Sequence, residues 1–167
     1  MREYTHDETV NWLSQLEKRM SSAGLALYDS KGRVLVVKAH YKRYWSFPGG
    51  VIDAGETPRQ AAVRETHEEV NVTIEDETAL RFCLVVDRVS DLAHTYQFIF
   101  EQQVDDELFH HVQLDGDEIE DYALVTRDEI IHSTQRRYSA STIEWASGKT
   151  GYSEQQFGPA GQRATTE

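Results

Sequence analysis

The segment from Thr57 to Val70 constrains the fold more than any other part of this sequence. It opens with Thr57-Pro58-Arg59-Gln60. A threonine at the N-cap, a proline at the first helical position and a glutamine three residues after the cap are typical of a helix start with a capping box. We therefore predict a helix that begins at Pro58 and runs to about Val70.

This predicted helix has two different faces. At about 100° per residue, Glu65, Glu68 and Glu69 fall within roughly 100° of arc, because residues three and four apart are neighbours on a helix. The mostly apolar residues gather on a separate face: Ala62, Val63, Thr66 and Val70. We expect the apolar face to pack on a sheet while the glutamates point into a cleft.

The acidic face predicts a metal site. Three like charges at this spacing destabilise a bare helix and raise one another's pKa values unless a cation lies among them. Carboxylate oxygens suit Mg²⁺, with Mn²⁺ as a possible substitute, and both ions also bind substrate phosphates. The competing interpretation of a glutamate run is an acidic, solvated helix face.

The remaining segments predict a mixed sheet covered by helices on its faces, which is an α/β fold. The strand-like runs are residues 23–28, 33–38, 79–89, 95–104 and 121–125. The first two flank Asp29-Ser30-Lys31-Gly32 and should form a hairpin. Capping-box patterns at Thr126 and Ser141 predict two short helices near the C-terminus.

Single residues in these segments carry further expectations. The one cysteine, Cys83, should be buried in a strand. His110 and His111 should lie on a strand with their rings on opposite faces, which argues against a zinc site.

We divide the chain into three parts. Residues 1–20 should form an amphipathic helix with Val10, Leu13, Leu16 and Met20 on one side, docked on the core or in contact with a second copy. Residues 21–150 should form the main domain, and residues 151–167 a flexible tail. The protein should be a monomer or a homodimer.

Composition limits the partners. The sequence has 29 acidic residues and 17 lysines and arginines, which gives a net charge of −12. The surface should therefore repel the phosphate backbone of a long nucleic acid. A nucleic acid partner is therefore disfavoured, whereas a small phosphorylated nucleotide fits if a bound cation inverts the local field. No apolar run approaches the roughly 18 residues of a membrane span, and the first residues do not look like a secretory signal, so we expect a cytoplasmic protein.

Cations and aromatic rings alternate just before Phe47-Pro48-Gly49-Gly50. Arg43, Tyr44 and Trp45 are the residues of this loop that we predict to bind substrate, through a stacked base and phosphates held by arginine. A plain surface role is the alternative for each of them.

The stretch from Gly50 to Val72 resembles the Nudix box, Gly-x5-Glu-x7-Arg-Glu-U-x-Glu-Glu-x-Gly-U, where U is a bulky apolar residue. The matching residues are Gly50, Glu56, Arg64, Glu65, Glu68, Glu69 and Val72. Thr66 replaces the first apolar residue, and Asn71 replaces the glycine that ends the helix. Asparagine is the next-best residue for a left-handed C-terminal position, so the helix should still stop there.

The resemblance implies an α/β/α sandwich of the Nudix type and assigns roles by position. Glu65, Glu68, Glu69 and the carbonyl of Gly49 would be the metal ligands, and Glu65 would also orient or deprotonate the attacking water. Arg64 would pair with Glu56 to join the loop to the helix, and we place it with Glu65 in the catalytic set. In the family the general base can come instead from a distant loop, which here contains Asp117, Glu118, Glu120 and Asp121. Of these four we place Glu120 in the catalytic set, and a solvated turn is the alternative for all of them.

The implied reaction is metal-dependent hydrolysis of a diphosphate linkage in a nucleoside diphosphate linked to another group. About 15 or 16 residues past the box, relatives that cleave ADP-ribose often carry a proline, and relatives that cleave dinucleoside polyphosphates carry a tyrosine, whereas this chain has Asp87 and Arg88. By elimination we favour a nucleoside triphosphate or another small nucleotide. The alternatives are a catalytically silent nucleotide-sensing module and an isoprenyl diphosphate isomerase, for which Cys83 in an apolar strand is an unpromising nucleophile.

Overall fold

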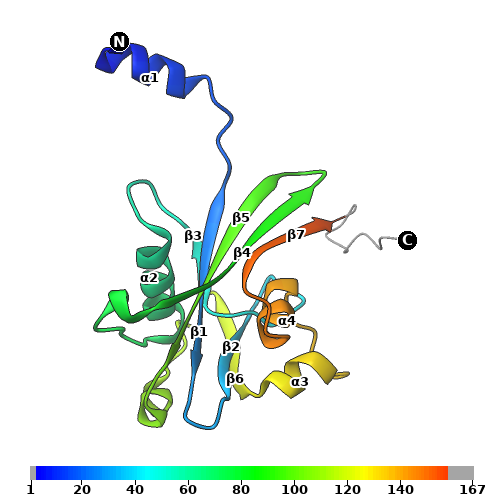
Figure 1. Ribbon diagram of the computed structural model, residues 1–167. Helices are drawn as coiled ribbons and strands as arrows, with labels where there is room; N and C mark the ends of the chain where they lie inside the picture. The colour runs from blue at the N-terminus through cyan, green and yellow to red at the C-terminus, as the bar shows by residue number, and fades with distance from the viewer. Residues whose placement is uncertain (1–2, 158–167) are drawn as a thin grey trace.

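One mixed sheet forms the centre of the molecule (Figure 1). The structure is a computed structural model that describes residues 3–157. Its strands are β1 (Ser21–Tyr28), β2 (Val34–Ala39), β3 (Gly49–Val51), β4 (Arg81–Ser90), β5 (His94–Gln103), β6 (Ile119–Val125) and β7 (Gly151–Phe157). They are ordered β6-β2-β1-β5-β4-β7, with β3 paired to β1 beside this path. The β1–β5 and β4–β7 pairs are parallel and the others antiparallel, so the predicted mixed sheet is confirmed.

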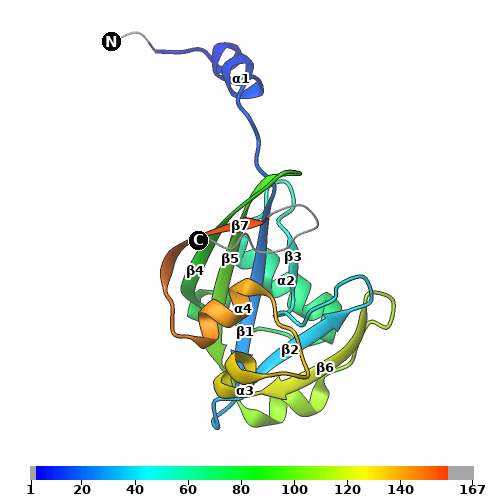
Figure 2. The same cartoon turned by 90° about the vertical axis from the view of Figure 1, so that its right-hand side faces the viewer.

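Helices cover both faces of this sheet. They are α1 (His6–Ser14), α2 (Pro58–Val70), α3 (Arg127–His132) and α4 (Ala140–Ala146), with short 3-10 helices η1 (Glu77–Ala79) and η2 (Asp106–His111). Figures 1 and 2 show α2 on one side of the sheet and α3 with α4 on the other. The predicted α/β/α sandwich is therefore confirmed.

Each face of the sheet has its own apolar core. On the α2 side, Ala62 and Val70 of the helix pack with Leu25 and Leu27 of β1. On the other side, Trp145 of α4 packs in a cluster with buried residues of the strands, and its ring meets that of Phe47 edge-on at 5.2 Å. Because successive side chains of a strand point to opposite faces, one sheet supplies both cores.

The ends of α2 form as the sequence predicts. The Thr57 hydroxyl accepts from the N–H of Gln60 at 3.2 Å, and the Gln60 side-chain oxygen accepts from the N–H of Thr57 at 3.0 Å. Asn71 has a φ of 55°, in the left-handed region. Asparagine therefore ends the helix in the left-handed conformation for which the box usually has glycine.

The N-terminal helix differs from its prediction. It ends at Ser14 instead of continuing to Met20, none of its residues is buried, and it projects away from the sheet (Figures 1, 2). The expectation that it docks on the core is wrong, because the chain leaves the helix and extends towards β1, where the N–H of Tyr96 donates to the carbonyl of Met20 at 3.2 Å. Contact with a second copy stays a prediction.

The chain after residue 150 also differs from its prediction. Residues 151–157 form β7 along β4 instead of a loose tail, and Ser153 and Gln155 are buried. Backbone pairing with β4 stabilises this polar segment as a strand. Its own side-chain pattern does not indicate a strand, because strand formation depends strongly on neighbouring strands. Residues 158–167 of the predicted tail lie outside the described residues.

Two local predictions are corrected as well. His110 and His111 lie at the end of η2, not on a strand, because Asp105 caps this turn by accepting from the N–H of Glu107 at 3.0 Å. Helix α4 is capped by Ser139, whose hydroxyl accepts from the N–H of Thr142, so Ser141 lies inside the helix. Cys83 is buried in β4, as predicted.

No helix within residues 3–157 combines the length and the apolar character that a membrane crossing requires.

We predict that substitutions of a buried strand residue and of an exposed α1 residue differ sharply in their effect on the free energy of unfolding. Leu25→Ala should lower the free energy of unfolding by about 2–5 kcal/mol, because Leu25 is fully buried and its truncation leaves a cavity. Trp12→Asp should change it by at most about 0.5 kcal/mol, because Trp12 is 59% exposed. Urea unfolding followed by circular dichroism measures both, and a large loss in Trp12→Asp would reveal a contact of α1 that the monomer lacks.

Candidate functional site

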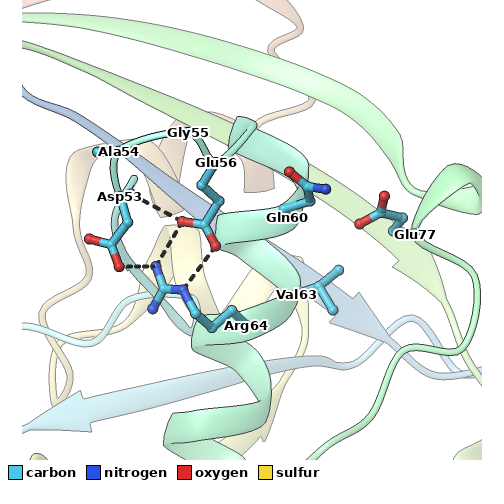
Figure 3. Close-up of a pocket in the computed structure, with 8 residues that line it drawn as sticks. All are labelled: Asp53, Ala54, Gly55, Glu56, Gln60, Val63, Arg64 and Glu77. Carbon is cyan, nitrogen blue, oxygen red and sulfur yellow. Dashed lines mark hydrogen bonds and ion pairs between the residues drawn. The ribbon is translucent and has the colours of Figure 1, made fainter.

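Arg64 joins α2 to the loop that precedes it (Figure 3). Its Nε donates to Glu56 Oε1 at 2.9 Å and its Nη2 to Glu56 Oε2 at 3.0 Å, a bidentate pair that holds the pKa of Glu56 below its usual value. Nη2 also donates to the carbonyl of Val51 at 3.0 Å. The predicted Glu56–Arg64 pair is therefore confirmed, and it fixes the end of β3 against the helix.

The third nitrogen of the same guanidinium contacts two of the predicted metal ligands. Nη1 of Arg64 donates to Glu65 Oε1 and to Glu68 Oε2, each at 2.9 Å. Glu65 is the more enclosed of the two, with 15% of its side chain exposed against 56% for Glu68. Arg64 thus supplies the positive charge that offsets the repulsion between these carboxylates.

Glu69 is the buried member of the acidic face. It is only 3% exposed, and its Oε2 accepts from the N–H of Gly49 at 2.9 Å. Burial raises the pKa of Glu69 to about 8, although the Gly49 N–H and the charge of Lys42 oppose the shift. Burial also raises the pKa of Glu65, against the opposing effect of Arg64.

The two glycines of β3 allow this close approach. A Cβ atom on Gly50 would lie 2.5 Å from Glu65 Oε1, and one on Gly49, whose φ is 148°, would collide with the carbonyl of Ala23 in β1. Side chains at these positions would push β3 away from both α2 and β1. The sequence signal of paired glycines therefore has a steric cause in this structure.

A hollow of about 510 Å³ lies beside the Arg64–Glu56 pair (Figure 3). Its lining includes Asp53, Gln60 and Glu77. Because none of the four predicted metal ligands lines it, this hollow is not the cleft that the acidic face predicts.

The donor atoms of the acidic face suit a hard divalent cation, but the carboxylates are not positioned around a common point. Its donors are carboxylate oxygens, the ligands that Mg²⁺ and Mn²⁺ prefer. Within residues 3–157, however, no group of three or more acidic, histidine or cysteine side chains already converges on one point. The reason is visible in the contacts: Arg64 holds Glu65 and Glu68, and Glu69 turns to Gly49.

Glu118 directly precedes β6, whereas Glu120, which we placed in the catalytic set, lies within this strand. Glu120 contacts Lys38 Nζ at 2.8 Å and His40 Nδ1 at 3.3 Å, and Lys38 lowers its pKa. Glu118 accepts from the Tyr41 hydroxyl at 2.6 Å, and its charge raises the pKa values of Glu65 and Glu69. The electrostatic interactions therefore favour Glu118, one of the alternatives, over Glu120 as the carboxylate from this part of the chain that acts on the acidic face of α2.

The predicted substrate-binding residues occupy one loop, and a distant segment supports it. The backbone N–H of Trp45 donates to the carbonyl of Arg137 at 2.7 Å, and the guanidinium of Arg136 lies 5.0 Å from the centre of the Trp45 ring. Arg43 and Tyr44 are exposed. Sequence reasoning missed Arg136, because no local motif connects it with a loop so far away in the chain.

Lys42 is a further residue that the prediction of Arg43, Tyr44 and Trp45 left out. Burial raises the pKa of Glu69, and the charge of Lys42 opposes this rise, so Lys42 lies within electrostatic range of the acidic face. The cation-rich sequence of the loop was the available signal.

We predict a pH dependence that Glu69 creates in the metal-free protein. Its folded pKa of about 8 lies above the usual 4.5, so its contribution to stability is complete below pH 4.5 and is lost as the pH rises through 8. Between pH 6 and 9 the free energy of unfolding of the wild type should fall by about 2–3 kcal/mol more than that of Glu69→Gln, because glutamine does not titrate. Urea unfolding of both proteins in EDTA measures the difference, and identical losses would show that Glu69 is not responsible.

The comparisons with known proteins agree with this arrangement. A family model described as the NUDIX domain matches residues 18–146. Over 55 residues, 33% of this chain and 32% of the relative, the chain is 44% identical to an RNA pyrophosphohydrolase of Aliivibrio fischeri (strain MJ11), so the match spans about a third of the curated relative.

Two solved structures share the fold at low sequence identity. A MutT NUDIX hydrolase from Burkholderia pseudomallei is 20% identical with a TM-score of 0.64, covering 80% of this chain and 100% of that one. The NUDIX domain of Shewanella oneidensis NrtR, complexed with ADP ribose, is 13% identical with a TM-score of 0.65, covering 83% and 94%. Because the family model matches residues 18–146, most of the chain, and all the charged residues of the box are present, this chain belongs to the Nudix family.

Proposed function

We propose that this protein hydrolyses a diphosphate linkage in a nucleoside diphosphate linked to another group, with a nucleoside triphosphate or another small nucleotide as the favoured substrate. The observation that carries the proposal is the packing of Glu65 and Glu69 against the Gly49–Gly50 backbone, beside Glu68 and under the charge of Arg64. Such crowding of carboxylates is costly unless a cation is bound during function.

The metal ligands in this proposal are Glu65, Glu68, Glu69 and the carbonyl of Gly49, with Mg²⁺ as the ion and Mn²⁺ as a substitute. When bound, the ion would neutralise phosphate charge and lower the pKa of a coordinated water. Arg64 keeps the carboxylates on one side of α2 through its pair with Glu56.

Protein groups can also handle the proton and the substrate. Glu65 has a raised pKa, which brings it closer to that of a base that works near neutral pH, and Glu118 is the second candidate for this role. Lys42 and Arg43 can hold phosphate oxygens, and Tyr44 with Trp45 can stack on a base.

A nucleotide-sensing role without turnover is the second candidate. The domain from Shewanella oneidensis binds ADP ribose, and the carboxylates here are not gathered around one point in the resting state. The complete set of box glutamates favours hydrolysis.

We predict that the protein releases phosphate or pyrophosphate from at least one nucleotide when Mg²⁺ is present and from none in EDTA. The panel should contain nucleoside triphosphates, ADP-ribose and a 5′-triphosphorylated oligoribonucleotide. Glu65→Gln should lower kcat by about 10²–10⁴-fold, the typical contribution of a positioned acid or base. Ligand-dependent melting without product from any substrate would instead support the sensing role.

We predict that substitutions of Glu118 and Glu120 affect turnover differently. Glu118→Gln should reduce kcat by more than 10-fold, since Glu118 acts electrostatically on Glu65 and Glu69 and is the second candidate for the general base. Glu120→Gln is the matched control and should retain kcat within a few-fold, because Glu120 contacts Lys38 and His40 instead. A larger effect of Glu120→Gln would return it to the catalytic set.

A further inference from the structure

Three long polar side chains lie side by side on the sheet face that α3 and α4 cover. Arg88 of β4 is the register partner of Gln155 of β7. Gln97 of β5 is the partner of Val86, so it is the diagonal neighbour of Arg88. Val86 belongs to the buried cluster on this face, and alternation along β4 places Arg88 on the same side. We call these three residues the Arg88 cluster.

Several atoms of the Arg88 cluster are buried without a hydrogen bond. They are Nε of Arg88, Oε1 of Gln97, and both Oε1 and Nε2 of Gln155. Gln155 is only 2% exposed. The side chain of Arg88 donates from Nη2 to Ser141 Oγ at 3.1 Å, and the charge of the buried Glu144 on α4 acts on it as well. Buried polar groups are rarely left unpaired in native proteins, so the unpaired atoms call for a partner that residues 3–157 do not supply.

The Arg88 cluster is connected with the loop that we expect to bind substrate. Trp45 of this loop packs against the buried apolar cluster on the same face of the sheet, and Phe47, which follows the loop, belongs to that cluster. Arg88 and Gln97 are themselves half-buried, so the Arg88 cluster reaches the surface.

The unpaired atoms present donors and acceptors together. Arg88 Nε and Gln155 Nε2 can donate, whereas Gln97 Oε1 and Gln155 Oε1 can accept. A guanidinium group pairs best with a base edge that carries a carbonyl oxygen, and the amide oxygens need a ring N–H or an amino group. A base in which a carbonyl adjoins a ring N–H, as in guanine, hypoxanthine or uracil, satisfies both, whereas adenine has no carbonyl.

We propose that Arg88, Gln97 and Gln155 recognise the nucleobase of the substrate and select an oxo-base over adenine. This inference rests on the proposed function and names its specificity. Binding requires the side chains of Arg88 and Gln97 to turn towards the base as it enters from the surface. Gln155 lies on β7, beyond the residues 18–146 that the family model matches, so this selection is a property of this chain's own C-terminal strand.

The test measures binding of nucleoside monophosphates, which does not depend on turnover. Isothermal titration calorimetry with Mg²⁺ compares GMP, UMP and AMP with ribose 5-phosphate, which lacks a base. The wild type should bind GMP or UMP at least about 10-fold more tightly than AMP. Gln155→Met and Arg88→Met should each bring this ratio close to one and leave the affinity for ribose 5-phosphate unchanged.

A matched control and a stability measurement separate recognition from damage. Gln156→Met alters the exposed neighbour on the other face of β7 and should retain the full preference. Gln155→Met should melt at the same temperature as the wild type or higher, because it removes an unpaired buried amide. Equal binding of GMP and AMP to the wild type overturns the proposal, and so does a preference that survives both Gln155→Met and Arg88→Met. A loss of ribose 5-phosphate binding in Arg88→Met also overturns it, since Arg88 would then hold phosphate.

These outcomes are distinct from those for the reaction. Base preference without hydrolysis of any nucleotide would contradict the proposed enzymatic function and retain the recognition site. Hydrolysis without base preference would support the proposed enzymatic function and contradict the recognition site.

Discussion

The guanidinium of Arg64 is the contact on which the candidate site depends. It donates to Glu56, to Glu65 and to Glu68, so one cation holds the preceding loop and the acidic face of α2 together. Without it, adjacent carboxylates would repel one another and weaken the helix. The contacts of Glu65 and Glu68 with Arg64 account for the absence of a ready three-ligand group within residues 3–157, and a metal ion at the proposed site would have to draw both carboxylates away from it.

The sheet gives its two faces different roles around this contact. On the α2 side, Gly49 and Gly50 let the backbone of β3 lie directly against Glu69 and Glu65, so burial raises the pKa values of both carboxylates. On the α3 and α4 side, an apolar core surrounds Trp145, and polar side chains interrupt it where Arg88 meets Gln155. The loop from His40 to Ser46 connects these regions, because the charge of Lys42 acts on Glu69 and Trp45 packs against the core around Trp145.

Local signals predicted much of this structure, because their causes are local. The capping box at Thr57, the left-handed Asn71 and the Glu56–Arg64 pair depend on residues close together in the sequence. The predictions that were wrong depended on distant partners. The periodicity of Val10 and Leu13 could not reveal that their helix finds no surface to pack on, and the polar run after Gly151 could not reveal that it pairs with β4.

The sequence by itself determined the placement of three glutamates on one helix face and the paired glycines before them, because helix geometry and backbone sterics follow from residue order. Only the tertiary structure decided that Glu118 acts electrostatically on those glutamates while Glu120 pairs with Lys38 and His40, since Glu118 precedes β6 and Glu120 lies within it. It also decided that Arg88, Gln97 and Gln155 meet, because strand order and register bring together segments that no motif connects.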